Sequence, residues 1–102
     1  MYGLIVKLRV VPGRRDEMIR ILRESAGDMP GCISYVVAND SADADVLWVS
    51  EVWDSVNSHD ASLLLPSVRN AIPRAKPLVL DFERIAVTTP VWGAGLRTVA
   101  DG

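Results

Sequence analysis

The fold is decided by residues 46–59, which read VLWVSEVWDSVNSH. β-Branched and aromatic residues dominate the first eight positions, and they predict a strand over residues 46–53. Because side chains alternate between the two faces of a strand, Glu51 shares one face with apolar neighbours. These neighbours are Leu47, Val49 and Trp53. A carboxylate in such surroundings is costly to bury without a partner, so Glu51 is the first candidate for a functional residue.

A helix is predicted directly after this strand. Asp54 or Ser55 has a side chain that can cap its N-terminus. The residues at inward-facing helical spacing are Val56, His59 and Leu63. This spacing turns His59, the only histidine of the chain, toward the same corner as Glu51. Further along, Pro66 can open another turn of helix.

The rest of the chain predicts three more strands and one more helix. Alternating apolar residues indicate strands over residues 2–11, 32–39 and 78–89, and an amphipathic pattern indicates a helix over residues 14–26. Residues 40–45, which read DSADAD, are too polar and turn-prone for anything but a hairpin loop. The order β-α-β-β-α-β predicts an α+β fold, a ferredoxin-like sandwich with an antiparallel sheet and helices on one face.

Length and composition favour one domain. The 102 residues are 49% hydrophobic and 24% charged, which fits a ferredoxin-like domain over residues 1–89 and a tail over residues 90–102. A net charge of -2 provides no basic patch for phosphates, so we expect no nucleic-acid partner. The longest apolar runs fall far short of the roughly 18 residues of a membrane-spanning helix. We therefore expect no membrane partner and, without a basic N-terminal segment, a cytoplasmic protein.

Cys32 is the only cysteine, which excludes an internal disulfide and a multi-cysteine zinc site. A lone cysteine is either a catalytic thiol or a small apolar residue of the core. The position of Cys32 at the start of a predicted strand, beside Gly31, favours the buried structural role. We expect no metal ion in the site.

The sheet face opposite the helices is predicted to be apolar. Three strands contribute to it by alternation: Ile5, Lys7, Arg9 and Val11, then Val46, Trp48, Ser50 and Val52, and last Val79, Ile85 and Val87 or their neighbours. Such a face is too apolar for open water. Face-to-face pairing of two sheets would bury it, so we expect a homodimer that closes a barrel across two subunits, with Trp48 in the interface.

The hairpin loop fixes which residues lie side by side. If residues 40–45 form the loop, paired positions sum to about 86, which sets Tyr35 beside Glu51 and Ile33 beside Trp53. With His59 arriving from the helix, four chemically useful side chains share one pocket between sheet and helices. Asn39 lies on the same strand face, further from the corner.

The run Gly31-Cys32-Ile33-Ser34-Tyr35, the acidic hairpin, the run Glu51-Val52-Trp53-Asp54-Ser55 and the helix with His59 together resemble the antibiotic biosynthesis monooxygenase domain family, within the dimeric α/β barrel superfamily. The resemblance spans residues 2–88. It implies a ferredoxin-like homodimer. In the family's enzymes it also implies oxygenation of polycyclic phenols, anthrones or quinols by molecular oxygen, without metal, flavin or haem.

Two family motifs are only partly present. Many members carry a histidine three residues beyond His59, where this chain has Ser62. The related haem-degrading branch has an asparagine on the first strand, a tryptophan on the third and a histidine on the second helix. Trp53 matches that tryptophan, but Val6 and about Leu63 occupy the other two positions, so we expect no haem.

Cofactor-free oxygenation defines which side chains the pocket needs. A phenol or quinol must lose a proton to become an anion that can reduce oxygen, so the site requires a base, an apolar cavity and a hydrogen-bond donor. His59 or Glu51 is the candidate base, oriented one by the other, and Tyr35 is the candidate donor. Further substrate contacts are expected from Trp53, Asn39 and Leu63. The expected partners are a small aromatic molecule and molecular oxygen, with no cofactor.

The same residues also have structural interpretations. Tyr35 and Trp53 are equally suited to be core aromatics, and Glu51 can tie a helix N-terminus or pair with an arginine. An inward histidine can be held by Glu51 for structure alone. Trp92 is more typical of a docked tail than of a lid over a ligand. The alternatives to an enzyme are therefore a protein that binds or senses an aromatic or quinone, and a structural dimer without a ligand.

Overall fold

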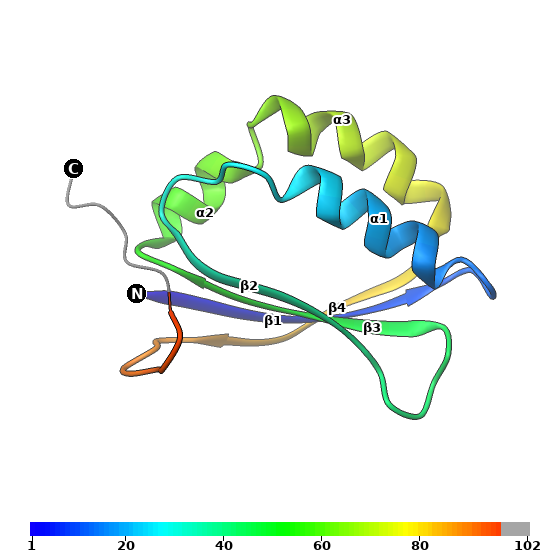
Figure 1. Cartoon of the computed structure of the whole chain (residues 1–102), viewed down its shortest axis with the longest axis horizontal. Helices are drawn as coiled ribbons and strands as arrows, with labels where there is room; N and C mark the ends of the chain where they lie inside the picture. The colour runs from blue at the N-terminus through cyan, green and yellow to red at the C-terminus, as the bar shows by residue number, and fades with distance from the viewer. Residues whose placement is uncertain (97–102) are drawn as a thin grey trace.

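The fold has two layers, an antiparallel sheet and a layer of helices on one of its faces (Figure 1). The computed structural model describes residues 1–96. Within them the strands are β1 (Tyr2–Val10), β2 (Cys32–Asn39), β3 (Val46–Trp53) and β4 (Val79–Thr88), in the sheet order β2-β3-β1-β4. The predicted α+β, ferredoxin-like architecture is confirmed.

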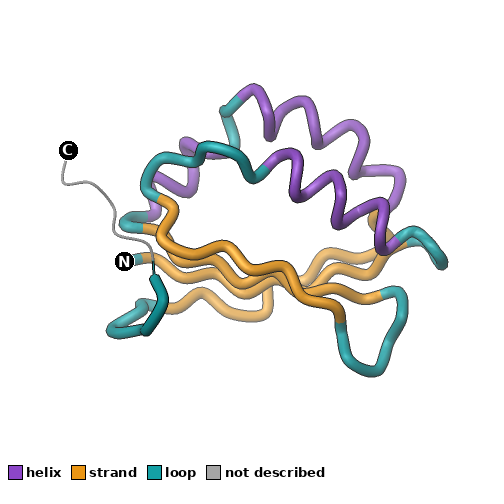
Figure 2. The backbone as a smooth tube through the Cα atoms, in the orientation of Figure 1, coloured by secondary structure: helices purple, strands orange, loops and turns teal. Residues whose placement is uncertain are grey.

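The helices are α1 (Arg15–Ser25), α2 (Val56–Ser62) and α3 (Pro66–Ala75), followed by the short 3-10 helix η1 (Lys76–Leu78). Figure 2 shows all of them on one side of the sheet and none on the other. The predicted extra turn after Pro66 is a complete helix, separated from α2 because the residue before a proline avoids the helical conformation. None of the helices in residues 1–96 is long and apolar enough to cross a membrane.

The core lies between the sheet and α1. Leu4, Val6, Leu8 and Val10 alternate along β1 on the helix side, and each is at most 5% exposed. They pack with Leu47 and Val49 of β3 and with Met18 and Ile21 of α1. The alternation read from the sequence is thus confirmed for β1 and for this face of β3.

The pairing of β2 with β3 is confirmed at one position and wrong at another. Tyr35 lies opposite Glu51, as predicted, but Trp53 pairs with Cys32 rather than Ile33. The cause is a register shift between Cys32 and Ser34, which inserts one extra residue into β2. Cys32 is 4% exposed and packs with Met29 and Trp53, so its predicted structural role is confirmed.

The start of β2 is tied to the start of α2. Gly31 has a φ of +83°, and its carbonyl oxygen accepts a hydrogen bond from the Asp54 N–H at 2.9 Å. A Cβ at residue 31 would lie 2.5 Å from Ser58 Oγ and 2.8 Å from Asp54 Oδ1. The close approach of these two segments therefore requires glycine.

The prediction for the open face of the sheet is wrong in β4. Val79 pairs with Val10 and Val87 with Leu4, so both valines share the helix side. Two register shifts in the β1–β4 pairing break the simple alternation, and Ile85 falls at one of them. The open face instead carries charged residues, with Asp81 opposite Arg9 and Glu83 opposite Lys7.

Val46, which the sequence places on the open face, is 1% exposed within the protomer. The hairpin loop folds back beside it, so that the Val46 N–H donates to the Asp43 carbonyl oxygen and Arg15 Nη1 donates to the Val46 carbonyl oxygen. Trp48 and Val52 remain half-buried on the open face. These two side chains form an apolar surface on the open face, beside the charged residues of β4.

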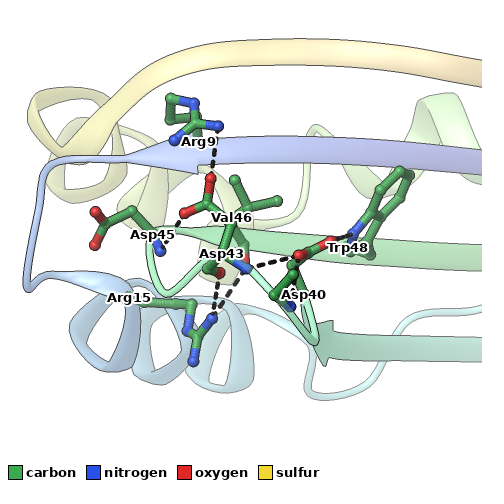
Figure 3. Close-up of polar contacts among 8 residues, drawn as sticks. Arg9, Arg15, Asp40, Asp43, Asp45, Val46 and Trp48 are labelled. Atoms are coloured by element: carbon green, nitrogen blue, oxygen red, sulfur yellow. Dashed lines mark hydrogen bonds and ion pairs between the residues drawn. The ribbon is translucent and has the colours of Figure 1, made fainter.

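The acidic loop over residues 40–45 is an ordered turn (Figure 3). Asp40 accepts hydrogen bonds from Trp48 Nε1 at 2.9 Å and from the Ala42 and Asp43 N–H groups. Asp43 accepts one from Arg9 Nη2 at 2.9 Å. The Trp48 indole first, and then the two backbone N–H groups, lower the pKa of Asp40 to about 2. The predicted hairpin loop is confirmed, and its carboxylates are what hold it.

Pro90, just after β4, lies beside Gly3, where an added Cβ would overlap Thr88 Oγ1 and would lie 3.0 Å from a Pro90 side-chain carbon. Beyond it, Val91 and Trp92 are 89% and 85% exposed, so Trp92 is not docked on the protomer. The remainder of the predicted tail, residues 97–102, lies outside the described residues.

Candidate active site

A cavity of about 300 Å³ lies between the helix side of the sheet and the helices. Its walls are mostly apolar and come from β1, α1 and α3, with Leu4, Val6 and Ile21 among them. The ionisable side chains that line it are Tyr35, Glu51, His59 and Arg84. A mostly apolar cavity with a few converging polar groups is the usual form of a small-molecule site.

Glu51 reaches the cavity from the middle of the sheet. Its register places it between Leu4 on β1 and Tyr35 on β2, and Trp53 Nε1 donates a hydrogen bond to Glu51 Oε1 at 3.0 Å. Burial raises the pKa of the Glu51 carboxyl above its usual value, while the hydrogen bond from Trp53 opposes the rise. A half-buried carboxylate with a raised pKa is a suitable base for a weakly acidic hydroxyl.

His59 enters the cavity from α2. The helix begins after Ser55, whose side chain accepts a hydrogen bond from the Ser58 N–H, as the sequence predicts for the cap. The His59 ring is 8% exposed and lies 5.4 Å from the Tyr2 ring and 5.7 Å from the Trp53 ring, centroid to centroid. His59 is therefore held by aromatic packing at the same end of the cavity as Glu51.

The hydrogen-bond partner of His59 differs from the expected one. Its Nδ1 lies 3.1 Å from Asp60 Oδ1, and the two candidate bases share no hydrogen bond in the described chain. The carboxylate of Asp60 is 66% exposed, so the ring is oriented from the solvent side. This contact occupies Nδ1 and leaves Nε2 without a partner among the described residues, as the atom available to a ligand.

Tyr35 is mostly buried opposite Glu51. Burial, reinforced by the nearby Glu51 carboxylate, raises the pKa of the Tyr35 phenol well above its usual value. The phenol therefore keeps its proton at any physiological pH and can act only as a neutral donor or acceptor. Trp53 is 1% exposed and forms the wall behind Glu51, with its indole N–H already used by that carboxylate.

Of the two remaining predicted substrate contacts, Leu63 lines the cavity and Asn39 does not. Leu63, at the end of α2, lines the cavity although its side chain is 49% exposed. Val56, predicted on the same inward face, is 47% exposed and does not line it. Asn39 is exposed at the far end of β2, opposite Leu47, and is not part of the cavity wall.

The sequence analysis missed two residues of β4. Phe82 and Arg84 line the cavity because their partners, Leu8 and Val6, belong to the helix side of β1. Their even spacing is the signal that identifies them, since both alternate with Asp81 and Glu83 on the other face.

No cluster of three or more histidine, cysteine, aspartate or glutamate side chains that could hold a metal ion occurs within residues 1–96. The side chains that line the cavity bring chemistry of their own. These are two potential bases, one neutral phenol and one guanidinium around an apolar space.

Comparison with known proteins gives a consistent picture. The model of the antibiotic biosynthesis monooxygenase family matches residues 1–74. A solved candidate antibiotic biosynthesis monooxygenase from Chloroflexus aurantiacus J-10-fl is 54% identical in sequence, with a TM-score of 0.89 over 93% of this chain and 97% of that chain. No curated protein matches the sequence significantly.

More distant structures share the fold. A candidate antibiotic biosynthesis monooxygenase from Nitrosomonas europaea is 11% identical, with a TM-score of 0.81 over 90% of this chain and 100% of that chain. One from Caulobacter crescentus CB15 is 18% identical, with a TM-score of 0.77 over 89% and 90% of the two chains. Because the family model covers most of the sequence and a solved relative is more than half identical, the chain belongs to the antibiotic biosynthesis monooxygenase family.

Proposed function

We propose that this protein is a monooxygenase that oxidises a hydroxylated aromatic or quinol with molecular oxygen, without a bound metal, flavin or haem. The observation that carries the proposal is the meeting of Glu51 and His59 at one end of an otherwise apolar cavity. Relatives described as monooxygenases support the reaction class. The resemblance to the family suggests the substrate class, and the mostly apolar cavity of about 300 Å³ is compatible with aromatic rings.

The reaction needs no group beyond the substrate, oxygen and these side chains. Removal of a hydroxyl proton gives an electron-rich anion, which passes its electrons to oxygen. One oxygen atom is then bonded to a ring carbon and the other leaves as water, with all four electrons supplied by the substrate. The part of the protein is to take the first proton, to hold the anion and to exclude water.

His59 Nε2 or the Glu51 carboxylate takes this proton. Both face the cavity, and each is fixed by another residue, His59 by Asp60 and Glu51 by Trp53. Tyr35 lies beside Glu51 and donates its hydroxyl hydrogen to the oxyanion. Leu63 and Trp53 contact the rings, whereas Asn39 is left out of the proposed site.

We also propose that the working unit is a homodimer, paired through the open face of the sheet. Trp48 and Val52 are half-buried on this face, and the helices of the described chain all lie on the other face of the sheet (Figure 2). Asp81 and Glu83, on the edge strand β4, set charges beside this apolar surface, as is typical of the polar rim of an interface.

Oxygen uptake by chelator-treated protein, with a panel of anthrones and quinols, tests the proposed reaction. We expect uptake that depends on the protein and incorporation of one labelled oxygen atom into the product. His59→Ala should remove most turnover if His59 is the base, whereas Asn57→Ala, an exposed change on the same helix, should not.

Three outcomes separate the functions. Oxygen uptake supports the enzyme. Binding of the aromatic without uptake identifies a binding or sensing protein instead. No binding of any member of the panel indicates a structural dimer. If His59→Ala lowers the melting temperature but leaves turnover per folded protein unchanged, His59 has a structural role only.

A further inference from the structure

Arg84 brings a positive charge to the rim of the cavity. It pairs with Val6 in the β1–β4 ladder and lies on the helix side of the sheet, two residues from Phe82. Its side chain lines the cavity but is exposed, whereas Glu51 is half-buried and His59 is buried. The cavity wall therefore carries the two potential bases at half-buried or buried positions and a cation at an exposed one.

No anion within the described chain neutralises Arg84. Ion pairs hold Arg9, Arg14 and Arg74 to carboxylates, but Arg84 takes part in no ion pair or side-chain hydrogen bond within residues 1–96. Glu51 lines the same cavity and feels the charge of Arg84, yet the two groups do not come within 4.0 Å in a salt bridge. The five N–H donors of the guanidinium are thus available to a ligand.

A ligand in the cavity can meet the potential bases and the guanidinium with two different groups. The hydroxyl that loses its proton must lie beside Glu51 or His59. The Arg84 guanidinium, which enters from the edge strand β4, is then left for a second group of the same ligand. Planar, bidentate binding of a carboxylate is the interaction that arginine forms best.

We propose that the site selects hydroxylated aromatics that also carry a carboxylate, on a ring position apart from the reacting hydroxyl, and that Arg84 binds this carboxylate. The inference rests on the proposed function for the placement of the hydroxyl. It assigns Arg84 a role in binding and specificity and no role in the proton transfer. Neutral aromatics of the same size enter the same cavity with lower affinity.

Calorimetric titration with two matched probes tests this selectivity. One probe is a hydroxynaphthoate with its hydroxyl and carboxylate on opposite rings, and the other is the corresponding amide. We expect the wild type to bind the carboxylate about tenfold more tightly than the amide, the effect of a charge-assisted hydrogen bond at a partly exposed site. Added salt should reduce the ratio.

Substitutions that remove one positive charge at two different positions show whether Arg84 causes the preference for the carboxylate. Arg84→Gln should lower the affinity for the carboxylate about tenfold and leave that for the amide unchanged, and Arg84→Lys should keep part of the preference. Arg69→Gln removes the same charge from an exposed position of α3 that does not line the cavity, and should keep the full ratio.

The outcomes separate this inference from the proposed reaction. Equal binding of the two probes, or an Arg84→Gln variant that keeps the preference, overturns the role of Arg84 and leaves the oxygenase proposal standing. Selective binding without oxygen uptake supports the role of Arg84 and contradicts the oxygenase. Failure of both probes to bind the folded wild type overturns the inference as well.

Discussion

Glu51 is a candidate base whose ionised form lowers the stability of the fold at neutral pH. Burial raises the pKa of its carboxyl, so the folded protein binds this proton more tightly than the unfolded chain does. The stability that comes from this linkage is present at acid pH and is lost as the pH rises through the raised pKa. At neutral pH the ionised carboxylate therefore makes the protein less stable than a neutral isostere would.

Glu51→Gln should consequently raise the melting temperature at neutral pH, because the amide oxygen still accepts the Trp53 N–H. The gain should vanish at pH 4 and below, where the glutamate is protonated in both states. If Glu51 is the base, turnover should fall about 10²-fold. Thermal unfolding across pH and oxygen uptake measure the two effects, and a variant less stable than wild type at neutral pH would contradict this account.

Gly31 and Gly13 offer a matched pair of substitutions. Both have a positive φ, +83° and +82°, but a Cβ at residue 13 meets nothing within 4 Å, whereas one at residue 31 meets Ser58 and Asp54. Gly13→Ala should cost about 1 kcal/mol for its backbone conformation alone. Gly31→Ala should cost about 2 kcal/mol more, since the start of α2 must move.

The displacement of α2 is the more informative consequence, because this helix carries His59. We expect Gly31→Ala, and not Gly13→Ala, to weaken binding of aromatic probes at a temperature where both variants are folded. Denaturant unfolding gives the stabilities and calorimetric titration the affinities. Equal effects of the two substitutions on binding would show that the contact of Gly31 with α2 does not position the site.

The residues of the site were predictable where strict alternation or a single register decided them. Glu51 faces the helices because β3 alternates without interruption, and Tyr35 lies beside it because the loop length sets the pairing. His59 is inward because the cap at Ser55 fixes the phase of α2. Its partner Asp60 was missed, since a neighbour in sequence normally points elsewhere on a helix.

At the scale of elements, the acidic hairpin loop over residues 40–45 should stabilise the protein less at low pH than at neutral pH. The pKa of Asp40 is depressed to about 2, so the stability that its hydrogen bonds provide is fully present above the ordinary pKa of an aspartate and is lost as the pH falls through about 2. Asp43, bound by the Asp45 N–H and Arg9, has its pKa lowered in the same direction.

Asp40→Asn should therefore be less stable than wild type at neutral pH, and the difference should shrink between pH 4 and pH 2. Chemical unfolding at a series of pH values gives the comparison. Ser41→Ala, an exposed change in the same loop, is the control and should track the wild type. A constant difference between Asp40→Asn and wild type across this range would exclude the charge as its cause.

The elements that sequence reasoning placed incorrectly are those where the chain departs from regular geometry. The extra residue at Ile33 and the two register shifts along β4 each change which side chains share a face, and no local pattern marks such insertions. Val46 is buried where the hairpin loop folds back on it and where Arg15 of α1, 31 residues away in sequence, donates a hydrogen bond to its carbonyl oxygen. The alternation of side chains along a strand predicts which face of the sheet a residue occupies only where the pairing with the neighbouring strand is regular.

For the whole molecule, the proposed dimer makes a direct prediction. Val52→Glu places a charge in the half-buried centre of the open face, and Trp48→Glu does so while also removing the hydrogen bond to Asp40. Both should abolish a dimer that buries about 2,000 Å² in total. Sedimentation at micromolar concentration measures the assembly state.

Leu64→Glu serves as the control, because Leu64 is 72% exposed on the side of the helices and should leave the dimer intact. A wild type that sediments as a monomer at these concentrations would refute the dimer. If Trp48→Glu dissociates the dimer while Val52→Glu does not, the loss would be assigned to the hairpin rather than to the face.

The irregular pairing of β4 also bears on the solubility of the protein. This strand is an edge of the sheet, and an edge offers free backbone groups to any passing strand. Its two register shifts interrupt the regular spacing that such a strand would need, and Asp81, Glu83 and Arg84 place three charged side chains along it. The distortion that brings Arg84 to the cavity thus also discourages the addition of further chains, so that exposed apolar residues such as Phe82 can serve a ligand without seeding aggregation.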